Sequence, residues 1–190
     1  MCAQEAWSEL GLDRVLLVPV GQAPHRKLEG DPGAEVRFEL CSLAVDGDER
    51  LEVSRAEVDR EGLSYTSDTL RLLSGEDELT LILGADQACA LPEWHEPDEV
   101  LDLARVAVAS REGVERERVL RRLGGLSSAR GVPAAERLHF FAMPRIDVSS
   151  SLVRSRAASG RPIRYLVPGQ VAGTIKTKGL YGAPARAGAQ

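Results

Sequence analysis

Short apolar runs alternate with stretches of helical periodicity along most of this chain, and that alternation limits the fold more than any other feature of the sequence. Four runs are mostly apolar and bounded by turn or charged residues, which is typical of strands buried on both faces; they are 14–20, 79–85, 105–110 and 138–143. The stretches with helical spacing are 36–45, 68–74, 97–104, 114–123, 150–158 and 168–176. Buried strands that alternate with helices predict an α/β fold with an open, doubly wound parallel sheet.

The length and composition fit one domain. A chain of 190 residues with 43% apolar residues can bury one substantial core, so we expect a single domain over 1–181. Residues 182–190 are small and lack an apolar period, which indicates a disordered tail. The segment 51–58 alternates apolar and polar residues and is expected to form a more exposed edge strand.

The charge and cysteine content narrow the class of function. A net charge of −5 argues against a surface that coats nucleic acid, because such surfaces carry clustered Lys and Arg. The three cysteines are odd in number and widely spaced, which indicates reduced thiols in the cytoplasm. No apolar run reaches the roughly 20 residues that a bilayer span requires. We therefore expect a soluble cytoplasmic protein with small-molecule chemistry, without a nucleic-acid or membrane partner.

The beginning of the sequence is unusual for an α/β protein. The segment 1–10, followed by Gly11, has helical character and a normal glycine stop, but no cap and no strand comes before it. Because an α/β chain usually begins with a strand, we expect that a first strand upstream of Met1 is missing.

The strongest motif is DVSSSLVR at 147–154, which follows an apolar strand and opens a helix. The free N–H groups of a helix start, the hydroxyls of Ser149, Ser150 and Ser151, and Arg154 one turn later could together bind phosphate. An ordinary serine N-cap with Arg154 in solvent also fits the spacing. Both interpretations stay open on the residues alone.

A second motif, GAD at 84–86, ends a buried strand and is followed by Trp94. The carboxyl ends of parallel strands are where ligands bind in open α/β sheets, so Asp86 could hold a ribose hydroxyl or a metal-bound water. Trp94 could stack on a planar ring, or it could be a partly buried core or lid residue.

Two weaker motifs add candidate polar groups. In GLSYTSDTL at 62–70 a turn leads into a helix capped by Thr66 or Ser67, which taken alone is good capping chemistry. In PVGQAPHRK at 19–27 an imidazole and two cations follow the end of a strand and could neutralise a polyphosphate, although an exposed basic loop fits equally well. His95 and His139 have no partners at metal-ligand spacing and are interpreted as structural. The sequence lacks a Walker-type glycine loop, a dinucleotide glycine fingerprint and a Ser/His/Asp order.

Taken in order, these motifs resemble the bacterial nicotinate-nucleotide adenylyltransferases of the nucleotidylyltransferase superfamily. That family combines Pro-x-x-x-Pro-Pro-His-Lys, Ser-Tyr-Thr-x-Asp-Thr-Leu, Gly-Ala-Asp with a downstream Trp, and Ile-Ser-Ser-Thr-x-x-Arg. The matching segments here are 19–27, 64–70, 84–86 with Trp94, and 148–154. The resemblance extends to Tyr181, implies a Rossmann-like nucleotidylyltransferase fold, and favours the phosphate interpretation of the 147–154 motif.

The resemblance implies an activity and a set of site residues. The phosphate of nicotinate mononucleotide would attack the α-phosphorus of ATP, with Mg²⁺ assisting, to give deamido-NAD and pyrophosphate. The ATP phosphates would be held by Ser149, Ser150, Ser151 and Arg154, with help from His25 and Lys27; Arg111 would reach the ATP end. The nicotinate nucleotide would meet Thr66, Asp68, Asp86 and Trp94, with Asp86 facing a ribose and Trp94 stacking on the nicotinate ring.

The sequence also departs from the family pattern. Ser151 stands where the family has Thr, Ala23 replaces a Pro, and Arg26 separates His25 from Lys27. The family's Gly-Gly-Thr-Phe-Asp-Pro-x-His-x-Gly-His loop and its preceding strand, which lies in the middle of the sheet, have no counterpart. The catalytic residues are therefore unassigned, with His25 and Lys27 as candidates. Either the start codon is placed too late or the protein is shortened and inactive; we favour the first, because a sheet without its central strand leaves backbone groups unpaired. We expect protein that begins at Met1 to be poorly folded and essentially inactive, and robust deamido-NAD formation by it would contradict this interpretation.

Two other functions remain open on the sequence. One is a nucleotidylyltransferase with another acceptor, such as phosphopantetheine or a sugar or lipid head-group phosphate. The other is a non-catalytic nucleotide-binding homologue. The preference between acid and amide nucleotides and the oligomeric state, including a homo-oligomer, also stay open.

Overall fold

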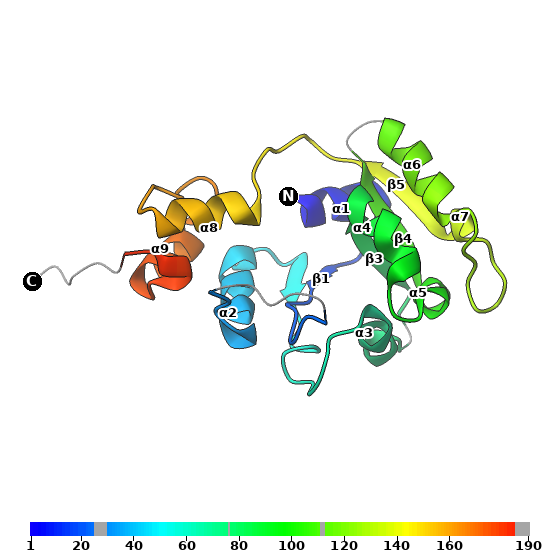
Figure 1. The fold of residues 1–190 in the computed structure, drawn as a ribbon, viewed down its shortest axis with the longest axis horizontal. Helices are drawn as coiled ribbons and strands as arrows, with labels where there is room; N and C mark the ends of the chain where they lie inside the picture. The colour runs from blue at the N-terminus through cyan, green and yellow to red at the C-terminus, as the bar shows by residue number, and fades with distance from the viewer. Residues whose placement is uncertain (25–29, 76, 111–112, 185–190) are drawn as a thin grey trace, which may run out of the picture. The chain divides into compact units, whose positions relative to one another are not determined.

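A computed structural model describes residues 1–24, 30–75, 77–110 and 113–184 of the chain (Figure 1). These residues divide into two compact units. Unit 1 combines Met1–Val15 with Ser64–Arg145, and unit 2 combines Leu16–Leu63 with Ile146–Gln190. The prediction of one domain over 1–181 stays a prediction, and each unit is described by itself.

Unit 1 is built on a three-stranded parallel sheet with strand order β3-β4-β5. The strands are β3 (Leu79–Gly84), β4 (Ala104–Ser110) and β5 (Leu138–Ala142). The parallel register places Leu83 opposite Val108 on one side of β4 and Val108 opposite Phe140 on the other. The parallel arrangement that the alternation predicts is therefore confirmed for these three strands.

Helices cover both faces of this sheet, as its sequence requires. The central strand β4 alternates between the faces, because Val106 and Val108 belong to one buried cluster and Ala107 and Ala109 to another. On the second face α1 contributes the fully buried Ala6 and contacts β5. The helical elements of unit 1 are α1 (Cys2–Leu10), α3 (Thr66–Leu73), α4 (Ala85–Ala90), η1 (Leu91–Glu93), α5 (Pro97–Leu103), α6 (Gly113–Leu123) and α7 (Ala134–Arg137).

Unit 2 is mostly helical and has a small sheet of its own. Strands β1 (Val15–Leu17), whose first residue is counted in unit 1, and β2 (Leu51–Val53) pair with each other. The helical elements are α2 (Ala34–Val45), α8 (Ser150–Ala158), α9 (Gly169–Thr177) and η2 (Leu180–Gly182). The core of unit 2 consists of five buried residues, Val153, Ala157, Ile163, Val171 and Ile175.

Several element boundaries differ from those predicted. The strand predicted over 14–20 ends at Leu17, shortly before Pro19, which has no N–H group to donate to a ladder. The alternating segment 51–58 forms a strand only over Leu51–Val53. The sequence predicts neither α4 nor α7, because helices of one or two turns are too short to show a clear period.

The end of the chain is only partly described. Gly182 closes η2, Pro184 is the last described residue, and the tail prediction for 185–190 falls outside the described residues. None of the helices in the described part of the chain has the length and apolar character needed to cross a bilayer.

Candidate active site

The start of α8, defined here as residues 149–154, brings together the residues of the predicted phosphate motif. Ser149 is the N-cap in an extended conformation, and its hydroxyl oxygen accepts a hydrogen bond from the Leu152 N–H at 3.1 Å. The capping interpretation is therefore correct for Ser149. Ser150 and Ser151 occupy the first helical turn, where backbone N–H groups have no partners within the helix.

Arg154 lies one turn into α8 and points back toward the hydroxyls. Its Nη2 donates to Oγ of Ser151 at 3.3 Å. No carboxylate among the described residues forms an ion pair with Arg154. Burial raises the pKa of Tyr181, and the positive charge of Arg154 acts in the opposite direction. The α8 start thus combines a positive helix end, a guanidinium and exposed hydroxyls, a set of groups that suits an anion.

The start of α3 carries Thr66 and Asp68 in unit 1. The N-cap is Tyr65, without a side-chain capping bond, so the prediction that Thr66 or Ser67 caps this helix is wrong. The helix begins at Thr66, so Thr66 and Ser67 lie inside the first turn and not at the capping position, and the Ser67 side chain is completely buried. Thr66 and Asp68 lie on either side of it and are only partly buried.

Asp86 lies where β3 passes into α4. Gly84 is the N-cap of α4, and Asp86 lies in the first turn. The Asp86 carboxylate accepts a hydrogen bond from Arg118 of α6 at 2.6 Å, and its side chain is 86% exposed. A Cβ atom added at Gly84 would have no atom within 4 Å other than those of Gly84 and its two chain neighbours, so the described part of the chain leaves open space at this end of the strand.

Trp94 follows η1 and is half-buried against the core of unit 1. The η1 turn is anchored by Arg122 of α6, which forms an ion pair with Glu93 and donates to the carbonyl of Cys89 at 3.2 Å. Part of the Trp94 side chain packs in the core, which is one of the two interpretations that the sequence leaves open. The rest of the side chain is exposed.

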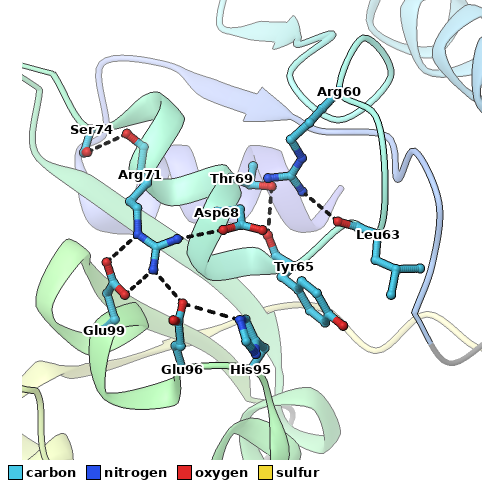
Figure 2. A network of polar contacts seen from close by, with 10 residues as sticks. All are labelled: Arg60, Leu63, Tyr65, Asp68, Thr69, Arg71, Ser74, His95, Glu96 and Glu99. Atoms are coloured by element: carbon cyan, nitrogen blue, oxygen red, sulfur yellow. Dashed lines mark hydrogen bonds and ion pairs between the residues drawn. The ribbon is translucent and has the colours of Figure 1, made fainter.

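A network around Arg71 connects α3 to the residues that follow Trp94 (Figure 2). Arg71 donates to Asp68 at 2.7 Å, to Glu96 at 2.5 Å, and through Nε to Glu99 at 2.6 Å. The hydrogen bond from Arg71 to Glu96 lowers the pKa of Glu96, and Ser67 contributes in the same direction. Sequence reasoning missed Arg71. Its spacing from Asp68 is readable, but its other two partners, Glu96 before α5 and Glu99 within α5, lie 25 and 28 residues away.

The candidate residues therefore form two sets, one in each unit. Unit 2 contains the α8 start, and unit 1 contains Thr66, Asp68, Asp86 and Trp94. The remaining candidates, His25, Lys27 and Arg111, lie outside the described residues. In the part of the chain that the structure describes, no group of three or more His, Cys, Asp or Glu side chains could hold a metal ion.

Comparison with known proteins places the chain in a family. Residues 1–156 match the cytidylyltransferase-like family. A probable nicotinate-nucleotide adenylyltransferase from Roseiflexus sp. (strain RS-1) is 42% identical over 182 residues, which cover 94% of this chain and 88% of that protein. A protein of the same name from Shouchella clausii (strain KSM-K16) is 35% identical over 185 residues, with coverage of 96% and 88%.

Solved structures resemble this one in fold. The nicotinic acid mononucleotide adenylyltransferase of Plasmodium falciparum, complexed with NaAD, superposes with a TM-score of 0.70 at 14% identity, covering 95% of this chain and 90% of that one. The same enzyme complexed with APC also superposes with a TM-score of 0.70. The shared architecture is the nucleotidylyltransferase fold. By sequence and by fold, the chain belongs to the cytidylyltransferase-like family, among the nicotinate-nucleotide adenylyltransferases.

Proposed function

We propose that this protein transfers the AMP group of ATP to nicotinate mononucleotide, giving deamido-NAD and pyrophosphate for NAD synthesis. Two relatives that align with 94% and 96% of this chain are named probable nicotinate-nucleotide adenylyltransferases. The structural observation that carries the proposal is the α8 start, where the capped helix end and Arg154 converge on exposed hydroxyls. A reaction between two phosphate-bearing substrates needs such a site.

The chemistry asks little covalent work of the protein. A phosphate oxygen of nicotinate mononucleotide forms a bond to the α-phosphorus of ATP, and the bond from that phosphorus to the bridging oxygen of pyrophosphate breaks. Catalysis then depends on aligning two anions and on neutralising the charge that develops on the leaving group. Groups with positive charge or free N–H donors matter more here than nucleophiles.

In this proposal the α8 start binds ATP. The N–H groups of the first turn and the hydroxyls of Ser150 and Ser151 contact phosphate oxygens, while Arg154 supplies charge. Ser149 has two roles in this proposal, because its hydroxyl caps the helix and also lies at the phosphate-binding end. Without that cap the first turn would fray and its N–H groups would lose their fixed direction. His25, Lys27 and Arg111 remain predicted contributors at the phosphates.

Unit 1 would hold the nicotinate nucleotide. The exposed part of Trp94 stacks on the nicotinate ring, and the α3 start presents Thr66 and Asp68 beside it. Asp86 accepts a hydrogen bond from a ribose hydroxyl. Arg118 already donates to Oδ1 of Asp86, which directs the carboxylate without occupying both of its oxygens.

Mg²⁺ enters this proposal with ATP, as the usual form of the nucleotide substrate. That ion prefers phosphate oxygens and water over an all-protein cage, which fits a site made of hydroxyls and a guanidinium. The cytoplasmic location and a homo-oligomer remain predictions from the sequence.

The direct test is an assay for deamido-NAD with protein expressed together with any in-frame coding sequence upstream of Met1. Nicotinate mononucleotide and MgATP should give equal amounts of deamido-NAD and pyrophosphate, and the amide nucleotide should react more slowly. If phosphopantetheine or a sugar phosphate reacts faster than nicotinate mononucleotide, that compound is the acceptor and the proposal is wrong. ATP binding without any product would favour a non-catalytic homologue.

A further inference from the structure

The turn that carries Trp94, defined here as residues 94–96, is fastened to α3 at two points. At one point the rings of Tyr65 and His95 lie with centroids 4.3 Å apart. At the other, Glu96 accepts from Arg71 at 2.5 Å. Tyr65 precedes α3 and Arg71 lies in its last turn, so the two contacts lie at opposite ends of this short helix (Figure 2).

The backbone at Glu96 needs such support. Glu96 has φ 49° and ψ 58°, in the left-handed region that side-chain-bearing residues rarely adopt, and it is the N-cap of α5. A non-glycine residue keeps this conformation only when surrounding contacts hold it. Arg71 donates a hydrogen bond to the carboxylate of Glu96, and His95 Nε2 lies 3.6 Å from the same carboxylate.

Arg71 is suited to this task by its geometry. Its planar guanidinium reaches three carboxylates at once: Asp68 on its own helix, Glu96 in the turn and Glu99 in α5. A lysine has one compact charge and could not satisfy them in the same fixed directions. The side chains of Arg71 and Glu96 are each 41% exposed, so an isolated ion pair here would contribute little to stability. The main effect of the network is to fix the orientation of the carboxylates that Arg71 contacts.

We propose that Arg71 is a positioning residue that fixes the Trp94 turn against the α3 start and thereby shapes the nicotinate-binding end of the site. The inference rests on the proposed function, in which Trp94 stacks on the nicotinate ring. One guanidinium sets both the direction of the Asp68 carboxylate and the backbone of the turn two residues beyond Trp94. Losing it should loosen both sides of the bound nucleotide together.

The test uses Arg71→Gln, Arg71→Lys and a matched control, Arg55→Gln. Arg55 of unit 2 also bridges two carboxylates, Glu35 and Asp59, and is 40% exposed, but it lies outside both sets of candidate residues. We expect Arg71→Gln to raise the KM for nicotinate mononucleotide about tenfold, while the KM for ATP and kcat change less than about twofold. Arg71→Lys should fall between the two, and Arg55→Gln should leave both KM values unchanged.

A second measurement needs no turnover. In a Trp7→Phe background, Trp94 is the remaining tryptophan, and acrylamide quenching of its fluorescence reports how freely the turn moves. Arg71→Gln should increase quenching in the absence of nucleotide, and Arg55→Gln should not. Unchanged quenching, or an equal rise in both KM values, would overturn the positioning role. If the unmodified enzyme makes no deamido-NAD, the proposed function fails, and quenching still decides whether Arg71 holds the turn.

Discussion

The α8 start draws all its polar groups from one short segment, whereas the surroundings of Trp94 are joined by side chains that lie far apart in the sequence. In α8 the cap, the hydroxyls and Arg154 follow from local helix geometry, so forming the helix places them. Around Trp94 the start of α3 and the turn depend on Arg71 reaching across 25 and 28 residues. We therefore expect substitutions in α8 to act separately and those near Trp94 to act as a coupled group.

The largest effect should come from Arg154→Gln. If the α8 start binds ATP phosphates, removing its guanidinium should lower kcat/KM for ATP about 10²–10³-fold, because a charged donor acts on the developing charge. Steady-state kinetics with varied ATP measure this. Arg161→Gln, in the segment after the same helix, is the control and should change kcat/KM little. Similar activity for both variants would remove Arg154 from the ATP site.

A smaller effect is expected at Trp94. Trp94→Ala should raise the KM for nicotinate mononucleotide about 10–100-fold, the range for losing one aromatic stacking partner. Trp94→Phe keeps a ring and should recover most of the affinity. Combining Trp94→Ala with Arg71→Gln should raise the KM by less than the product of the two single effects, because part of the effect of Arg71 acts through Trp94 and the rest through Asp68. Additive effects in that double-mutant cycle would break the proposed coupling.

Ser149 separates capping from phosphate binding. Ser149→Ala should lower the free energy of unfolding by about 1 kcal/mol, because a capping hydroxyl is lost. Ser149→Asp keeps a good cap but places a negative charge at the α8 start, so thermal stability should be retained while the KM for ATP rises about tenfold through repulsion. An unchanged KM for ATP in Ser149→Asp would show that the phosphates bind elsewhere.

The smallest effect is a pH dependence of the Trp94 turn. Because Arg71 lowers the pKa of Glu96, this contact is fully present above the ordinary Glu pKa of 4.5 and is lost as the pH falls through the lowered value. Acrylamide quenching of Trp94 should therefore stay constant from neutral pH down to about 4.5 and increase below it. Asp68 and Glu99 also face Arg71, and His95 lies beside Glu96, so Glu96→Gln is the necessary control. That variant should show high quenching already at neutral pH, and a normal acid response in it would assign the effect to Asp68 or Glu99.

The sequence predicts the elements of this fold better than their pairing. The helix over 150–158 is observed with the same bounds, because Ser149 is a strong local cap and Gly160 a clear stop. The strands β3, β4 and β5 were recognisable because buried parallel strands are almost continuously apolar. That β1 pairs with β2 in a sheet of its own could not be read from the residues, because pairing depends on contacts between distant segments.

The candidate site shows the same limit. The α8 start was predictable because spacing along one helix fixes which groups meet. The predicted cap of α3 is wrong because Thr66 and Ser67 both suit a cap by residue type, whereas the helix begins at Thr66 and places Tyr65 at the capping position. Arg71 and Arg118 were missed, because nothing in a single sequence tells which distant carboxylate an arginine will reach.

Unit 2 is formed by two segments that are far apart in the sequence, and this affects how it can fold during translation. Two hydrogen bonds connect α2 and its C-cap to α9 and its C-cap: Lys178 donates to Glu39 and Gln170 donates to Asp46, pairs that are 139 and 124 residues apart. During translation, residues 16–63 leave the ribosome long before α9 exists, so unit 2 cannot complete its core until nearly the whole chain has been made. The last residue of unit 1 is Arg145, so unit 1 can fold before unit 2. Until α9 is synthesised, α2 stays partly exposed. Slow elongation or premature termination at that stage would therefore increase aggregation or proteolysis of α2.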